Sequence, residues 1–544
     1  MLVALCLAEA AAAERTILPK PPPLNPKLTV CDVSGRPGDL LFFTSIQGVV
    51  NQEDPCLYLI TEQQSDPVWL DWIVKRGYVK EVTPVAPDDL VKTFRSRLQG
   101  AVVYDPALPA SINVATMIAG LEQLAVIPPG MIGTCGLPVK EDLRGRFTDN
   151  PTAYAWAIEH LMPRLSKDAM SSQFPTRPNT RDYLIQNRIF TFWVTAPGDK
   201  EKTGASPKER EVIERAFALT KPQAPVTGFW YTDEENKGIN EYYGVMSAGE
   251  FGKCTVVDPL STNNSIHAAI RVDPEVFRQR RPPLAQLDPG KVYVAVSIIE
   301  SGDAPFYWST RQKTVWDDPN RGQVPISWCI GPATLDTRPD ILEWYYRNAT
   351  PNDYFFTALS GAAYIMPIYF AKKDSDPEAA WDGFLGLTDR YMEKLDLDMV
   401  SLHMDSWAVS PTHYDDSLIF KRYAERLPRL RTILSDFGKM EDLNLARANH
   451  WVAGRDVTVF HCLNRWLFEG INEHQPEWLA NEIRKVTPKE RPGFMFVMAL
   501  SWSYTPTDIL KAKEILGPKY EFVTVRDLDH LFRLTHPRPG EKAE

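Results

Sequence analysis

The sequence predicts an α/β protein in which a C-terminal (β/α) barrel follows smaller α/β domains. Short apolar runs recur through the second half of the chain, and most are followed by an amphipathic helical pattern. The runs are VYVAVSII, VPISWCI, YFFTAL, DMVSLHM, RTIL, VTVF, FMFVMAL and FVTV. Such runs, rich in β-branched and aromatic residues and alternating with helical patterns, are typical of parallel sheets. Their number favours a barrel of seven or eight strands, with its chemistry at the strand ends. The stretch 309–322 has no helical pattern, which favours an irregular barrel.

The N-terminal half shows the same alternation in shorter units. Apolar runs such as CLYLIT, AVVYDP, IFTFWVT and CTVVD alternate with helical patterns such as VWLDWIVKRG and EREVIERAFAL. A Pro-rich stretch, RRPPLAQLDPG, has the composition of a linker. We therefore predict a leader at 1–16, α/β domains at 30–150 and 151–280, and the barrel at 288–536.

Composition limits the possible functions. The 544 residues carry a formal charge of −10 and lack a Lys/Arg-rich stripe, which argues against a nucleic-acid partner. After the leader, no apolar run approaches the ~20 residues of a membrane span. The leader MLVALCLAEAAAA resembles a secretory signal cut near Ala13, so we expect a secreted or periplasmic protein. The sequence does not predict an oligomeric state.

Acidic residues follow several of the predicted barrel strands. Glu300 and Asp303 follow the first run, Asp405 the fourth and Asp436 the fifth. Glycosidic bond cleavage requires two carboxyl groups facing the bond, one as acid and one as nucleophile or base. Any of these acids could instead cap a helix or pair with a loop arginine.

Histidines and tryptophans also occur near the strand ends. His403 and His461 could orient a sugar, support a carboxylate or be structural. With Asp303 they could form a metal site, although the compact His-x-x-x-His spacing is absent, so we predict neither a metal nor a cofactor. An indole face can stack on a sugar ring, and Trp308, Trp328, Trp407 and Trp502 are the candidates; each could equally pack in a core.

Four segments resemble the GxGYxYP putative glycoside hydrolase family. The motif after the third barrel run reads Gly361-Ala362-Ala363-Tyr364-Ile365-Met366-Pro367. TSIQGVVNQ is similar to the family's "SLQG-x-x-N" element, NNSIHAA to its "N-x-S-x-H" element, and VPISWCIGPATLD to its second barrel strand. The resemblance covers nearly the whole chain and implies a carbohydrate substrate, with Tyr364 near the sugar. It also directs attention to Gln47, Asn51, Asn264 and His267, as substrate contacts or as interdomain hydrogen bonds.

This chain departs from the family pattern at a few positions. Where relatives carry Ser-Asp-Gly-Asp-Asn it has Glu300-Ser301-Gly302-Asp303-Ala304, and Ala363 and Met366 replace a glycine and a tyrosine. We therefore expect a glycoside hydrolase acting on a poly- or oligosaccharide through Asp303, with Asp405 as its partner. The alternatives are a non-catalytic glycan-binding protein and a metal-dependent polysaccharide deacetylase.

Overall fold

The computed structural model describes residues 15–195, 206–229, 241–299, 304–404, 417–435, 449–463 and 475–540. These residues form two compact units. Unit 1 contains the chain up to Val272 together with Leu335–Asp340 and Ala371–Ala380, and unit 2 contains Asp273–Thr334, Ile341–Phe370 and the chain from Trp381. The predicted domains 30–150 and 151–280 therefore fall almost entirely within unit 1.

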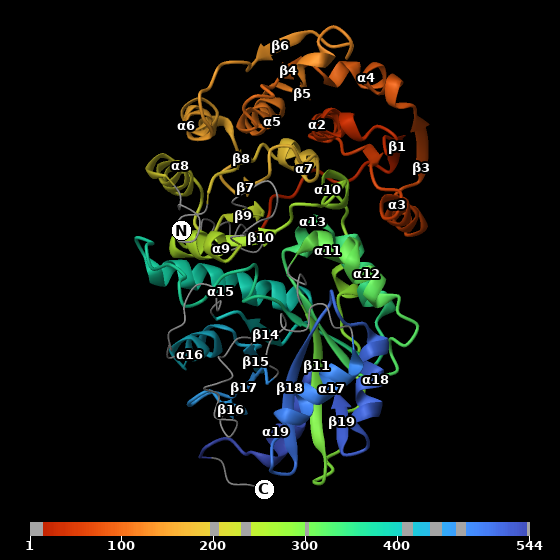
Figure 1. Ribbon diagram of the computed structural model, residues 1–544, viewed down its shortest axis with the longest axis vertical. Helices are drawn as coiled ribbons and strands as arrows, with labels where there is room; N and C mark the ends of the chain where they lie inside the picture. Colours follow the sequence, from red (N-terminus) through yellow and green to blue (C-terminus); the bar gives the residue numbers. More distant parts are fainter. Residues whose placement is uncertain are drawn as a thin grey trace, which may run out of the picture. The chain divides into compact units, whose positions relative to one another are not determined.

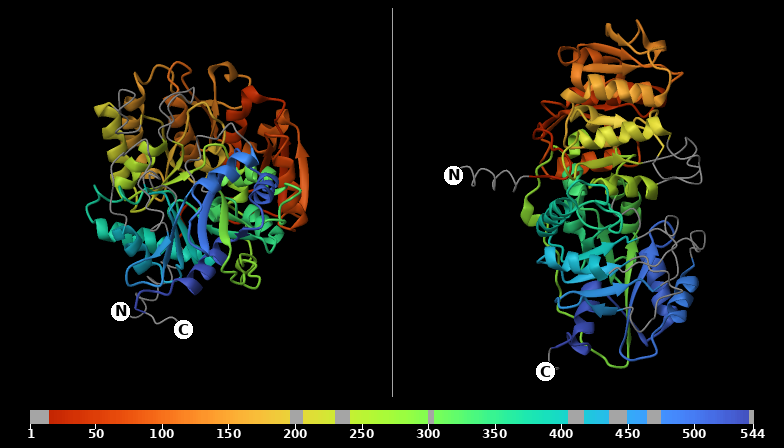
Figure 2. Two further views of the ribbon diagram at one scale, coloured as in Figure 1. Left: turned by 60° about the horizontal axis from the view of Figure 1, so that its bottom comes forward. Right: turned by 90° about the vertical axis from the view of Figure 1, so that its left-hand side faces the viewer.

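Unit 1 is built from three small parallel sheets, ordered β2-β1-β3, β5-β4-β6 and β10-β9-β7-β8. Their strands are β1 (Lys27–Asp32), β2 (Leu57–Ile60), β3 (Glu81–Val85), β4 (Gly100–Val103), β5 (Leu124–Ile127), β6 (Val139–Asp142), β7 (Met170–Ser172), β8 (Phe190–Phe192), β9 (Pro225–Gly228) and β10 (Cys254–Val257). Their helices are α2 (Leu40–Val50), α3 (Asp66–Lys75), α4 (Leu90–Thr93), α5 (Ala110–Glu122), α6 (Asn150–His160), α7 (Arg181–Gln186), α8 (Pro207–Ala218), α9 (Glu241–Glu250) and α10 (Asn264–His267). In the right-hand view of Figure 2, the orange strands β4 to β6 form a layer separate from the yellow-green strands that follow them.

The motif TSIQGVVNQ lies on the buried helix α2, which packs between neighbouring sheets of unit 1. Nine of its residues, Phe42 to Val50, are buried. The Ser45 hydroxyl accepts a hydrogen bond from the Val126 amide of β5 at 2.9 Å. Gly48 lies where a Cβ would come within 2.7 Å of the Asp182 carbonyl oxygen, so only glycine allows this approach to α7.

Unit 2 contains one large curled sheet, ordered β16-β17-β15-β14-β13-β12-β11-β18, with β19 also paired to β11. Its strands are β11 (Val292–Ile299), β12 (Ile326–Ile330), β13 (Asp353–Thr357), β14 (Met399–Leu402), β15 (Thr432–Ser435), β16 (Asn449–Trp451), β17 (Thr458–His461), β18 (Gly493–Leu500) and β19 (Tyr520–Val523). The helices that occur along this stretch of chain are α11 (Pro305–Ser309), α12 (Arg311–Trp316), α13 (Thr334–Thr337), α14 (Pro339–Asn348), α15 (Pro377–Lys394), α16 (Ser417–Arg426), α17 (Pro476–Lys485), α18 (Pro506–Leu516) and α19 (Val525–Thr535). No helix in the described part of the chain has the length and apolar character needed to cross a membrane.

The predicted α/β class is confirmed, and the predicted irregular C-terminal barrel is a large curled sheet that forms a half-barrel. All eight apolar runs overlap strands, and every strand pairing in this sheet except that of β16 is parallel. β11 is long enough for β19 to pair with its first half and β12 with its second half, and Figure 1 shows β11 beside β18 and β19 although they are far apart in sequence. The two ends of the curl meet at one bridge, Cys462 with Phe496, so the described sheet is a half-barrel joined at one point.

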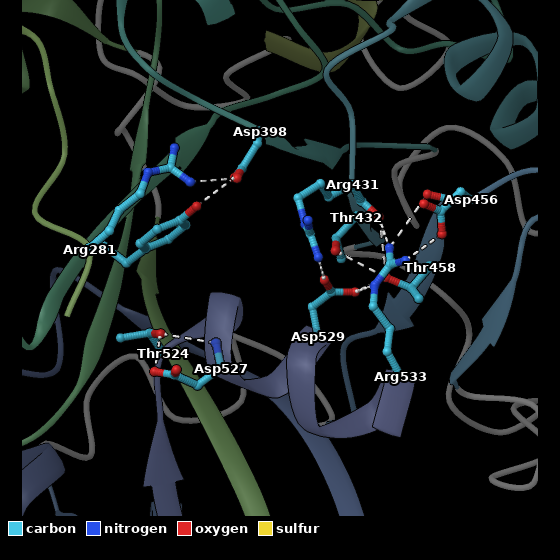
Figure 3. A network of polar contacts seen from close by, with 11 residues as sticks. Arg281, Asp398, Arg431, Thr432, Asp456, Thr458, Thr524, Asp527, Asp529 and Arg533 are labelled. Atoms are coloured by element: carbon cyan, nitrogen blue, oxygen red, sulfur yellow. Dashed lines mark hydrogen bonds and ion pairs between the residues drawn. The ribbon is translucent and has the colours of Figure 1, made fainter. Parts of the chain in front are cut away.

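Helix α19 is held against the sheet by an ionic network around the buried carboxylate of Asp529, shown in Figure 3. The carboxylate of Asp529 is 1% exposed; it accepts hydrogen bonds from Thr458 Oγ1 at 2.6 Å and Arg533 Nε at 2.7 Å. Arg431 supplies a third contact at 3.2 Å. The network ties the last helix to the amino ends of β15 and β17.

Candidate active site at the carboxyl ends of the C-terminal sheet

The carboxyl ends of the parallel strands in unit 2 form one edge of its sheet. Glu300 and Asp303 follow β11 in the chain, Asp405 follows β14, and Asp436 follows β15. These four acids, and Trp407, lie outside the described residues. β14 and β15 are direct neighbours, with Leu402 paired to Ser435, so the chain leaves the sheet at adjacent positions before Asp405 and Asp436.

The two predicted histidines do not share a face of the sheet. Met399 and Phe460 belong to the aromatic cluster that the sheet shares with α19. Side chains alternate between the two faces along a strand. His403, four residues after Met399, therefore lies on the same face as Met399. His461, next to Phe460, points to the opposite face. His461 contacts Phe420 of α16 at 5.9 Å between ring centroids and stacks on His450 of β16 at 5.5 Å.

His461 therefore lies on the opposite face of the sheet from His403, as the structural alternative for this histidine allows. Burial, reinforced by the nearby His450, lowers the pKa of His461 to about 4. Its Nδ1 makes no hydrogen bond to any described residue. A neutral histidine packed against a helix is a core residue. No group of three potential metal-binding side chains occurs within the described ranges.

The family motif forms a buried loop after β13 that holds His403 and Tyr364 together. Ser360 donates to the Ile365 carbonyl oxygen at 3.0 Å and accepts from the His403 amide at 2.9 Å. Tyr423 of α16 donates to the Ser360 carbonyl oxygen at 2.6 Å. The rings of Tyr364 and His403 meet edge to face at 5.5 Å.

Ser360 is thus a positioning residue that sequence reasoning did not identify as part of the site. The available signal was its place at the end of a strand, directly before the motif. Met366, where the motif has its second tyrosine, is fully buried, so the substitution lies in the core of the loop.

The tryptophans divide into buried and exposed groups. Trp308, Trp316 and Trp328 are buried and pack around Tyr345 of α14 and each other, with centroids 4.7 to 5.1 Å apart. The indole N–H of Trp328 donates to Asp353 at 2.9 Å. Trp308 and Trp328 therefore offer no surface to a sugar in this structure. Trp502, just after β18, is 42% exposed and rests against Tyr307.

The N-terminal candidates are buried and bonded within unit 1. Gln47 donates to Asn263, Asn51 to Ser265 and Asn264 to Asp258, at 2.6 to 2.9 Å. The His267 ring lies 3.0 Å from the Asp340 carboxylate. The contacts of Gln47, Asn51 and His267 join segments far apart in sequence, which matches the alternative that these residues have a structural role. Gln47 also lines a cavity, considered below.

Solved structures of similar fold include "a putative hydrolase from Bacteroides thetaiotaomicron VPI-5482". It is 20% identical, covers 95% of this chain and 97% of its own, and superposes with a TM-score of 0.77, which establishes a shared fold. A putative polysaccharide deacetylase from Mycobacterium smegmatis is 11% identical and covers 49% of this chain and all of its own. Its TM-score of 0.30 supports no inference. No curated protein matches the chain.

Family models account for most of the sequence in consecutive segments. The first, second and third GxGYxYP N-terminal domains match residues 35–96, 98–165 and 167–269. The domain described as "GxGYxYP putative glycoside hydrolase C-terminal domain" matches residues 290–533. These matches agree in order with the motifs around Gln47, Asn263 and Gly361. The chain therefore belongs to the GxGYxYP putative glycoside hydrolase family.

Proposed function

We propose that the protein hydrolyses glycosidic bonds in a poly- or oligosaccharide, using a pair of carboxyl groups at the carboxyl ends of the unit 2 strands. The observation that carries the proposal is the chain position of the acids: Glu300, Asp303, Asp405 and Asp436 each follow a parallel strand of the same sheet. Active sites of barrel enzymes lie at this edge. Membership of a family described as glycoside hydrolases supports the same reaction class.

Asp405 is the acid shared by the two pairs that we propose, with Asp303 or with Asp436 as its partner. Asp303 follows β11, three strand positions from β14 in the sheet, while Asp436 follows its direct neighbour β15. Adjacent strands are about 4.8 Å apart, so Asp405 with Asp436 would suit the ~5 Å separation of a retaining enzyme. Asp405 with Asp303 must reach across the curl, which suits the ~6.5–9.5 Å of an inverting enzyme. We favour Asp303, because it retains one of the acids of the family element.

The test is hydrolysis of a polysaccharide panel by wild type and by Asp303→Asn, Asp405→Asn and Asp436→Asn. Asp456→Asn is the matched control, because this side chain of unit 2 is 72% exposed and follows no strand of the rim. We expect Asp303→Asn and Asp405→Asn to lose about 10²–10⁴-fold in rate, and Asp456→Asn to lose nothing. Loss in Asp436→Asn but not Asp303→Asn would replace the pair with Asp405 and Asp436.

Non-catalytic glycan binding is the second candidate, and Ser301 favours it because relatives carry an acid at this position. An exposed Trp502 could serve either function by stacking on a sugar. Binding of an oligosaccharide without any hydrolysis, unchanged in both Asp303→Asn and Asp405→Asn, would support this candidate instead.

Export is a further proposal, supported by the apolar leader followed by small residues near Ala13. Sequencing the N-terminus of the protein recovered from its native host tests this proposal. Removal of the leader at this position supports export, and an intact N-terminus contradicts it.

A further inference from the structure

Unit 1 contains a polar cavity that the proposed hydrolysis does not use. Loops that follow the carboxyl ends of β2, β7 and β10 surround it, together with one side of α2. In open parallel sheets, ligands bind at the carboxyl ends of the strands. This cavity lies beside the carboxyl ends of strands from two of the small sheets, β2-β1-β3 and β10-β9-β7-β8.

The cavity is large enough for a small molecule, and most of the residues that line it are polar. The space open to the centre of a water molecule is about 80 Å³. One water needs about 10–15 Å³ of such space, so several waters, or one ring of sugar size, fit. Only Leu40 and Pro178 of the twelve lining residues are apolar.

The lining side chains have already used most of their hydrogen-bond protons. The hydroxyls of Thr61 and Thr262 donate to Asp66, at 2.8 and 2.6 Å. Thr180 donates to the Asp258 carbonyl oxygen at 3.0 Å. Both protons of the Gln47 amide are taken by the Leu57 carbonyl oxygen and Asn263 Oδ1. A hydroxyl that has donated its proton offers only lone pairs, so these side chains present acceptors to the cavity.

Carboxylates add negative charge to this acceptor surface. Glu62 is exposed at the mouth, and Asp182, 2% exposed, lines the interior. Asp66, just behind the lining, is 2% exposed. One buried guanidinium, Arg338, reaches the surrounding loop by donating to Ser261 Oγ at 3.1 Å and to the Thr262 carbonyl oxygen. Burial raises the pKa of both Glu62 and Asp182, and a positively charged occupant would offset this cost by stabilising their ionised forms.

We propose that this cavity binds a small protonated amine that also carries hydroxyl groups, the chemistry of an amino sugar. Such a ligand brings the N–H and O–H donors that the lining lacks, and its charge faces Glu62 and Asp182. Asp182 is fixed for this role because Ser265 donates to its carboxylate from both backbone and hydroxyl, at 2.8 and 2.7 Å. The proposal rests on unit 1 alone and is independent of hydrolysis at the unit 2 rim.

Calorimetric titration of the full chain with glucosamine, glucose and N-acetylglucosamine tests the chemistry. The three probes share a ring but only glucosamine carries a charged amine. We expect glucosamine to bind at least tenfold more tightly than the other two. Equal binding of glucose would show recognition of a neutral polyol and overturn the assignment of a cation. Absence of glucosamine binding at millimolar concentration would overturn the site.

Two matched substitutions locate the binding. Glu62→Gln removes the charge at the mouth from an exposed side chain, so the fold is preserved, and glucosamine affinity should fall about tenfold or more. Glu53→Gln makes the same change at an exposed position of unit 1 outside the lining and should leave affinity unchanged. Equal affinities in the two variants would contradict the assignment. Unaltered glucosamine binding in Asp405→Asn would separate this site from the hydrolytic one.

Discussion

At the level of single residues, Gly361 illustrates why the family motif begins with glycine. Its φ of +146° lies where L side chains are strained. A Cβ at this position would approach Thr388 Oγ1 to 2.6 Å and the Phe384 ring to 3.1 Å. Thr388 Oγ1 also accepts the Ala362 amide at 3.0 Å, so it cannot withdraw without breaking the loop.

We predict that Gly361→Ala destabilises the protein by about 1–3 kcal/mol. Gly386→Ala is the control, because nothing lies within 4 Å of its Cβ position on α15; alanine there should be neutral or stabilise by up to ~1 kcal/mol. Urea unfolding monitored by tryptophan fluorescence measures both. Equal midpoints for the two variants would contradict the role assigned to the loop.

A second residue-level prediction concerns pH and His461. The pKa of His461 is about 4 in the folded protein against an ordinary value of 6.5. Its neutral form is favoured by folding, so stability is complete above pH 6.5 and falls as the pH drops towards 4, because only the unfolded chain takes up the proton. This residue accounts for up to about 3 kcal/mol of that loss.

The matching variant is His461→Phe, which keeps the ring contact with Phe420 but cannot titrate. Its unfolding midpoint should fall less than that of wild type between pH 7 and pH 4.5. A parallel fall in both proteins would show that His461 is not held neutral by burial.

Residue roles were only partly predictable from the sequence. His403 and His461 both follow or end strands, but they lie on opposite faces of the sheet because their positions in the side-chain alternation differ by one. Comparing each histidine with the core residues Met399 and Phe460 of its own strand makes this difference visible. The burial of Trp308 and Trp328 was not predictable, because an indole suits a core and a sugar platform equally well. Trp308 packs against Tyr345 of α14, and the sequence pattern did not connect this helix to the tryptophans.

At the level of elements, α19 is the clearest case of a helix fixed by buried charge. Asp529 accepts hydrogen bonds from both Thr458 and Arg533, so its removal takes the buried carboxylate from the half-buried Arg533 and leaves this guanidinium with only the exposed Asp456 as a carboxylate partner. We predict that Asp529→Ala costs about 3–5 kcal/mol. Asp456→Ala removes the exposed partner of the same Arg533 and should cost at most ~1 kcal/mol. Thermal unfolding compares them, and similar losses would refute the importance of burial.

The elements themselves were largely predictable. Every apolar run in the C-terminal half corresponds to a strand. The strands of a parallel sheet are buried on both faces, so their sequences are continuous apolar runs. The antiparallel β16 (Asn449–Trp451) was missed, since three half-buried residues carry no such pattern. The first half of β11 pairs with β19 and its second half pairs with β12. These pairings depend on long-range register, which the periodicity of the sequence does not encode.

At the level of the whole molecule, the two units carry the two proposed sites separately. Unit 2 carries acids after parallel strands of one sheet, and unit 1 carries an acceptor-lined cavity. The sequence alone directed attention to Gln47 but not to Glu62 or Asp182, because the cavity arises from loops that are distant in the chain. The acids of unit 2, in contrast, were visible as polar endings of apolar runs.

The most direct test of the central claim is the kcat/KM for release of reducing ends from the best polysaccharide substrate, compared between wild type and Asp405→Asn. We predict a loss of about 10²–10⁴-fold, because Asp405 belongs to both proposed carboxylate pairs, with Asp303 or with Asp436. The variant should be folded, with its thermal midpoint unchanged. A kcat/KM equal to that of wild type would contradict hydrolysis by a carboxylate pair at this rim.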